Sequence, residues 1–306
     1  NVYPLAALTQ GLEGEQLAEM YTLQQAGCIG VSNALASIDN TEVLRRAFEY
    51  AHSCDMTVFF YAEDRALKNN GTAHEGPIST RLGLPPIPET AETVAVSKAL
   101  LLIEQTNVRA HFCRLSTACS VQMIKTAQEQ GLPVTADVSI CHLHLTDMDI
   151  ADYNSDCHLQ PPLRSERDRS GLIDGINNGT ITAVCSDHQP HDVDAKSAPF
   201  TLTEPGASTI EHLLPLMLHL VNRNEITLEQ AVSVLTFQPA NVLGIDKGIL
   251  AINSDADICI VDTDAIVSVD KDKLFSAGKN TPFKGWELQG KVTHTLLNGN
   301  VVFHQD

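Results

Sequence analysis

The sequence predicts an α/β fold, namely part of a TIM-type (β/α)8 barrel followed by a small β appendage. Two observations predict it. Short β-branched and apolar runs alternate with amphipathic segments of about 10–15 residues, which is typical of βαβ units and a parallel sheet. From about Gly244 onward the runs are strand-like, and one pair is joined by Asn298-Gly299, a turn suited to a hairpin. We therefore expect a partial barrel at 1–243 and a β-sandwich-type appendage at 244–306.

The expected elements follow in chain order. The sequence predicts six barrel strands, whereas a closed barrel has eight. We therefore expect two βα units to be missing ahead of residue 1. The appendage is expected to contain strands at 257–262, 291–297 and 301–303. The barrel strands are expected at 2–8, 28–31, 57–61, 108–113, 133–138 and 180–185, and the helices at 15–26, 41–52, 90–104, 118–130, 166–178, 208–222 and 228–235.

Composition and charge narrow the class of function. A net charge of -18 argues against nucleic acid and anionic membranes as partners, because phosphates would be repelled. No apolar run approaches the length of about 18 residues that a membrane span needs. The eight cysteines show no Cys-x-x-Cys spacing, so we expect reduced thiols and a cytoplasmic location.

A polar cluster follows the last barrel strand. The stretch CSDHQPH, residues 185–191, places a carboxylate and two imidazoles directly after a β-branched run. Metal-dependent hydrolases need a metal to activate water and a carboxylate to move the proton. Asp187 is therefore the candidate acid/base.

These residues resemble those of the amidohydrolase superfamily and, more narrowly, of dihydroorotase. The resemblance implies zinc-dependent interconversion of carbamoyl aspartate and dihydroorotate. It also implies that His191 contacts the substrate carboxylate and that the backbone of Pro205 and Gly206 lines the substrate pocket. Further stretches that carry the resemblance are Ala26-Gly27-Cys28, Glu63-Asp64, Glu75-Gly76, Gln160-Pro161-Pro162-Leu163-Arg164, Gln238-Pro239-Ala240 and Asn280-Thr281-Pro282-Phe283.

Three positions depart from the family's metal ligands. Asn33 replaces an acid, and Tyr61 replaces a histidine. Arg114 replaces another histidine, and a guanidinium has no lone pair for a cation. We expect Arg114 to pair with Asp187 where zinc would otherwise lie.

Histidines and a cysteine elsewhere are not expected to rebuild that site. His142 and His144 are interpreted as a polar pair at a strand end. His111 is interpreted as part of an outward-facing run, and Cys113 is expected to point away from Arg114 because side chains alternate along a strand.

The sequence thus predicts a dihydroorotase-like protein of pyrimidine biosynthesis that is catalytically inactive. The resemblance extends to pseudo-dihydroorotases that act as non-catalytic partners of aspartate carbamoyltransferase in an oligomeric complex. No cofactor is expected in that case. The alternatives are an active zinc-dependent dihydroorotase or a hydantoinase- or allantoinase-like hydrolase, and a sensor that holds an anionic metabolite with Arg114 and His191.

Overall fold

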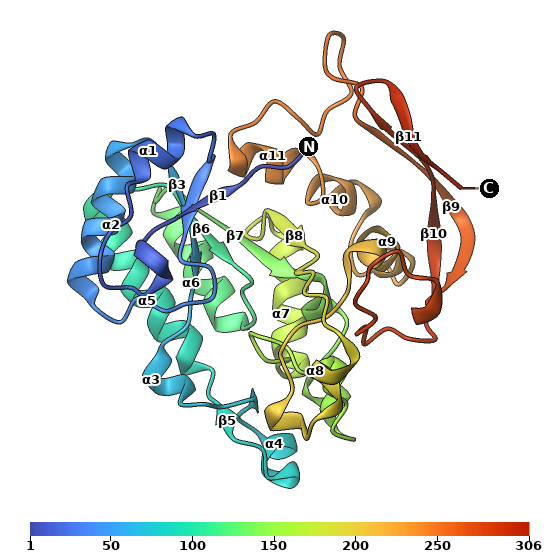
Figure 1. Cartoon of the computed structure of the whole chain (residues 1–306), viewed down its shortest axis with the longest axis horizontal. Coiled ribbons are helices and arrows are strands. Elements are labelled where there is room, and N and C mark those ends of the chain that lie inside the picture. The colour runs from blue at the N-terminus through green and yellow to red at the C-terminus, as the bar shows by residue number, and fades with distance from the viewer. Residues whose placement is uncertain (306) are drawn as a thin grey trace.

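The computed structural model describes residues 1–305 and contains a central parallel sheet of six strands (Figure 1). The strand order is β1-β2-β3-β6-β7-β8, and every neighbouring pair is parallel. The six predicted barrel strands are confirmed. The sheet is open, with β1 at one edge and β8 at the other. The strands are β1 (Leu5–Ala7), β2 (Gly30–Ser32), β3 (Thr57–Tyr61), β6 (Ala110–Cys113), β7 (Val134–Ser139) and β8 (Ala183–Cys185).

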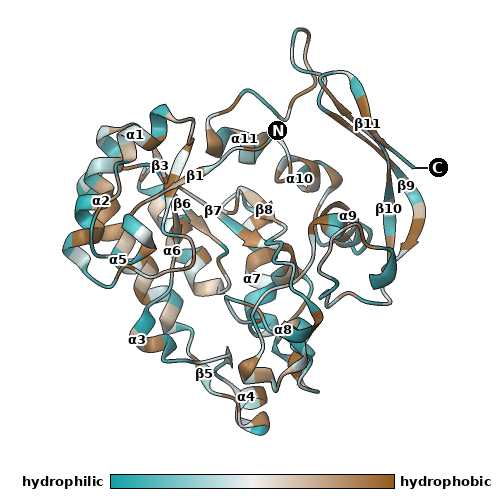
Figure 2. Cartoon of the chain, viewed as in Figure 1, coloured by the Kyte–Doolittle hydropathy of each residue, from teal (hydrophilic) through white to brown (hydrophobic). Residues whose placement is uncertain are grey.

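Amphipathic helices cover the outer face of this sheet. Helix α2 begins at Thr41, where the Asn40 side chain accepts the backbone N–H groups of Glu42 and Val43. Figure 2 shows its two faces, hydrophobic and hydrophilic, and its apolar side buries Phe48 against the sheet. The larger helices of the barrel are α2 (Thr41–Ser53), α5 (Thr90–Thr106), α6 (Ala118–Glu129), α7 (Glu166–Asn177) and α9 (Leu213–Asn222).

Shorter elements connect these units, and two helices begin later than predicted. The helix expected at 15–26 begins only at Met20, because Thr9 and Leu17 form a β-bridge around a tight turn. The helix expected at 208–222 opens with a 3-10 turn before α9. The other short elements are α1 (Met20–Gln25), α3 (Arg65–Lys68), β4 (Ala73–His74), α4 (Pro77–Leu82), β5 (Pro86–Ile87), α8 (Val193–Ser197), α10 (Leu228–Ser233) and α11 (Phe237–Leu243).

The appendage, expected to be a small unit of β-sandwich type, contains one antiparallel sheet in the order β11-β10-β9. Asn298 and Gly299 both have positive φ, 49° and 77°, as a two-residue hairpin of this kind requires. The predicted hairpin is therefore confirmed. The three strands are β9 (Ile258–Ser268), β10 (Glu287–Leu297) and β11 (Asn300–His304).

An aromatic cluster joins the appendage to the barrel. The ring of Trp286 lies 5.1 Å from that of Phe283 and 6.0 Å from that of His144. His219 of α9 completes the cluster. Burial, together with the neighbouring His219 ring, lowers the pKa of His144 to about 3. His144 is thus a packing residue, apart from the cluster after β8.

We expect this histidine to make stability depend on pH. Its folded-state pKa lies below the ordinary value of 6.5, so the unfolded chain binds the proton more readily as the pH falls below 6.5. His144 should therefore cost roughly 1–2 kcal/mol of stability between pH 7 and pH 5. Urea unfolding of His144→Phe should show a smaller loss over that range than the parent protein. His52→Gln, on the exposed end of α2, is the control, and an unchanged slope in His144→Phe would contradict the assignment.

Candidate functional site

The carboxyl ends of the six parallel strands surround a cavity of about 610 Å³. Parallel α/β sheets place their ligand sites at this edge. All six barrel strands, or the residues that directly follow them, contribute to the lining. The residues are Leu5, Ala6, Ala7, Leu12, Ser32, Ala34, Phe59, Cys113, Arg114, Asp137, Cys185 and Asp187.

The expected ion pair between Arg114 and Asp187 is present in this cavity. Arg114 follows β6 and Asp187 follows β8, and Arg114 Nη1 lies 3.1 Å from Asp187 Oδ1. Both residues have positive φ, 55° and 48°, which turns each chain as its strand ends. The two side chains are only 16% and 10% exposed. Although burial alone would lower it, the neighbouring Asp187 raises the pKa of Arg114, so the guanidinium remains charged.

Tyr61 covers the same guanidinium. The Arg114 Cζ atom lies 4.9 Å from the centre of the Tyr61 ring, within range of a cation–π interaction. The phenol O–H donates to Glu63 Oε2 at 2.9 Å. Burial, followed by the charge of Glu63, raises the pKa of Tyr61 well above its usual value. Tyr61 therefore stays protonated and holds Arg114 in place.

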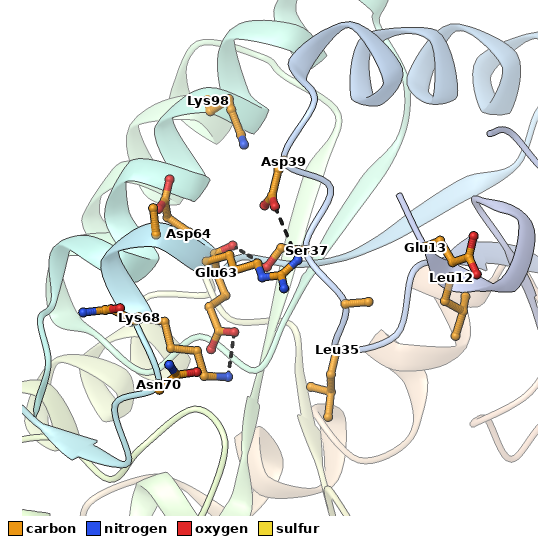
Figure 3. Close-up of a pocket in the computed structure, with 14 residues that line it drawn as sticks. Leu12, Glu13, Leu35, Ser37, Asp39, Glu63, Asp64, Lys68, Asn70 and Lys98 are labelled. Atoms are coloured by element: carbon orange, nitrogen blue, oxygen red, sulfur yellow. Dashed lines mark hydrogen bonds and ion pairs between the residues drawn. The ribbon is translucent and has the colours of Figure 1, made fainter. Parts of the chain in front are cut away.

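Glu63 links this site to a neighbouring cavity of about 950 Å³ (Figure 3). Its Oε1 accepts from Lys68 Nζ at 2.9 Å and from Gln160 Nε2 at 3.2 Å. Figure 3 shows Glu63 and Lys68 pointing toward one another, with Asp39 across the cavity. Arg114, Tyr61 and Glu63 form a continuous chain of polar contacts across the two cavities.

Asn33 has a structural role. It is buried, its Oδ1 accepts from Thr9 Oγ1 at 2.6 Å, and its Nδ2 donates to the carbonyls of Leu12 and Ala36. The carboxamide therefore fixes the loops after β1 and β2 and is not turned toward Asp187.

His191, Pro205 and Gly206, which the resemblance assigns to the substrate pocket, lie close to one another. His191 Nε2 lies 3.0 Å from the Pro205 carbonyl oxygen. Gly206 has φ 132°, and a Cβ there would lie 2.6 Å from the Gln189 Cβ, so only glycine fits. Sequence reasoning did not place Asn280 here, yet its Oδ1 accepts the His191 N–H at 2.8 Å and its Nδ2 donates to the Gly206 carbonyl at 3.0 Å. The only available signal was that Asn280 opens one of the stretches that carry the resemblance.

The interpretation of His111 and Cys113 was wrong. His111 is buried, and its Nε2 lies 3.0 Å from Asp137 Oδ2 inside the barrel. It is Phe112 that faces outward, where it packs against Phe60. Cys113 lines the same cavity as Arg114, because the positive φ of Arg114 interrupts the alternation of the strand. Ligand atoms of His111, Cys113 and Asp137 all lie within 4.8 Å of one another.

The sequence profile of the Amidohydrolase family matches residues 41–302. The chain belongs to the amidohydrolase family. It is 47% identical over 301 residues to a dihydroorotase-like protein of Pseudomonas putida, covering 98% of this chain and 71% of that protein. It is 38% identical over 303 residues to a dihydroorotase of Geobacter sp. (strain M21), covering 99% and 71%. The L-hydantoinase of Arthrobacter aurescens has the same fold, with a TM-score of 0.87 and 26% identity over 97% of this chain and 69% of that one.

The expectation that no cofactor is bound must be corrected for this amidohydrolase. Amidohydrolases, including dihydroorotases and hydantoinases, are typically metal-dependent. The described part of the chain also contains the donor group of His111, Cys113 and Asp137.

The positions at which the resemblance implied metal ligands carry side chains whose contacts do not suit a cation. At the matched positions Arg114 supplies a cation, Tyr61 a protonated phenol and Asn33 an amide whose oxygen and nitrogen are both hydrogen-bonded.

Within residues 1–305, no helix has the length and hydropathy of a membrane span.

Proposed function

We propose that this amidohydrolase is a dihydroorotase-like protein of pyrimidine biosynthesis that does not turn over dihydroorotate. It acts in the cytoplasm as a non-catalytic partner of aspartate carbamoyltransferase within an oligomeric complex. The partner comes from the resemblance to pseudo-dihydroorotases. The loss of turnover rests on the geometry of the barrel mouth.

The Arg114–Asp187 ion pair carries the proposal. A carboxylate that acts as acid/base must reach the reacting water and substrate. Asp187 Oδ1 is already held by Arg114 at 3.1 Å and by Gln189 Nε2 at 2.9 Å. His191 is likewise held by Asn280 and the Pro205 carbonyl, which favours a structural role.

The test is turnover by the full-length protein in both directions, ring opening of dihydroorotate and cyclisation of carbamoyl aspartate, with added Zn²⁺. We expect no rate above buffer, while the Geobacter dihydroorotase assayed in parallel turns over. Size-exclusion chromatography with the aspartate carbamoyltransferase of the same organism should give a joint, larger species. Turnover comparable to that of the control enzyme would overturn the inactivity, and separate elution would overturn the partnership.

An active cyclic-amide hydrolase is the second candidate. It is favoured by the donor group of His111, Cys113 and Asp137 and by the fold shared with L-hydantoinase. Assay of hydantoins and allantoin under the same conditions separates it from the first candidate, because only a hydrolase would open these rings.

A further inference from the structure

Four metal-ligating side chains meet inside the barrel, on the strands that also lead to the Arg114–Asp187 pair. They come from three neighbouring strands: His111 and Cys113 from β6, Asp137 from β7 and Cys185 from β8. In the register of the sheet, Thr135 is paired with His111 and Ser139 with Cys185, which places Asp137 between these two levels on the interior face of β7.

The distances suit a small cation. His111 Nε2 lies 3.0 Å from Asp137 Oδ2, and Cys185 Sγ lies 3.4 Å from Asp137 Oδ1. Ligands of tetrahedral Zn²⁺, at bond lengths of about 2.0–2.3 Å, stand roughly 3.3–3.8 Å apart. The Cys113 Sγ is within 4.8 Å of both the His111 and Asp137 donors. Cys185 joins this set through its contact with Asp137, and a bound cation would draw its thiol toward the donors of His111 and Cys113.

Neighbouring groups hold two of these ligands in orientation. His111 Nδ1 lies 2.7 Å from Thr135 Oγ1, which leaves Nε2 for the interior. The backbone N–H of Arg114 donates to Asp137 Oδ1 at 2.7 Å. Hydrogen bonds of this kind to the far side of a ligand are a common feature of protein metal sites.

We propose that His111, Cys113, Asp137 and Cys185 form a closed, structural site for a thiophilic divalent cation of the Zn²⁺ class, separate from the position that Asp187 marks. Two sulfur donors exclude Mg²⁺ and Ca²⁺, which prefer oxygen. Four protein ligands leave no open position for water, as in structural zinc sites. The site ties β6, β7 and β8 together and does not depend on the proposed function.

The charges are consistent with this assignment. Burial, followed by the Asp137 carboxylate, raises the pKa of each of the two thiols well above its usual value, so both carry protons without the cation. Binding displaces these protons to solvent and forms two metal–thiolate bonds. Two thiolates and one carboxylate on a dication leave one net negative charge, and the Arg114 guanidinium lies beside it.

The test is titration of chelator-treated full-length protein with Co²⁺, whose thiolate complexes show a charge-transfer absorption that histidine and carboxylate complexes lack. We expect one equivalent to produce this band and Zn²⁺ to abolish it. Cys113→Ser and Cys185→Ser should each weaken the band and reduce the affinity by about tenfold or more. Cys119→Ser, on the exposed start of α6, is the matched control and should leave the band unchanged.

Circular dichroism and thermal unfolding distinguish loss of the site from loss of the fold. Circular dichroism establishes that each variant is folded, and Zn²⁺ should raise the unfolding temperature of the parent and of Cys119→Ser by more than that of Cys113→Ser. No thiolate band in the parent protein would overturn the proposal. A full band that survives in both the Cys113 and Cys185 variants would do the same.

Discussion

Replacing Arg114 with methionine is expected to lower the free energy of unfolding by about 3 kcal/mol. The guanidinium is the charged partner of Asp187, at 3.1 Å, and both side chains are largely buried. Methionine fills a similar volume but leaves the carboxylate uncompensated in the cavity, with Gln189 as its remaining partner. Removal of one member of a buried pair is strongly destabilising because the remaining charge has lost its solvent and its partner.

Urea unfolding followed by the fluorescence of Trp286, the only tryptophan, measures this change. The double variant with Asp187→Asn should recover part of the loss, because it removes the unpaired charge. Arg109→Met is the control: its pair with Asp55 is exposed, so a change below about 1 kcal/mol is expected. Equal losses in Arg114→Met and Arg109→Met would show that the buried ion pair contributes no more to stability than the exposed one.

Local patterns in the sequence were sufficient to predict the six strands of the parallel sheet. Runs such as 57–61 and 133–138 are β-branched or apolar, and each became a strand within a residue or two of its predicted ends. Because helices separate these runs, the sequence also predicted that the strands are parallel. The Arg114–Asp187 pair was predicted from the resemblance, which assigns both residues to one metal position at the carboxyl ends of the strands.

The interior of the barrel was less predictable for a physical reason. Alternation along β6 assigns Cys113 and Arg114 to opposite faces, but the positive φ of Arg114 ends the strand there and turns both into one cavity. No local propensity marks an arginine for that conformation. Asn280 was missed for another reason: it reaches His191 across 89 positions of sequence, which only the folded chain brings together.

Replacing Glu92, which the sequence did not single out, is expected to destabilise the protein more than replacing Arg114. This buried residue of α5 accepts the backbone N–H groups of Ser116 and Thr117 at 3.0 Å and 3.1 Å, together with both of their hydroxyls. These residues lie in the turn between β6 and α6, after Arg114 and Leu115. A carboxylate with four donors in the interior is well satisfied, and each donor left without a partner costs about 1–3 kcal/mol.

Glu92→Ala is therefore expected to lower the free energy of unfolding by about 4 kcal/mol, measured by urea unfolding. Glu92→Gln keeps one acceptor oxygen and should lose about half as much. Glu42→Ala is the control, because the Glu42 side chain is 57% exposed and its ion pairs with Arg45 and Arg46 contribute little. A loss in Glu92→Ala no larger than in Glu42→Ala would mean that the turn after β6 is held by its neighbours instead. The position of Arg114 would then have to be explained without Glu92, by its contacts with Asp187 and Tyr61 alone.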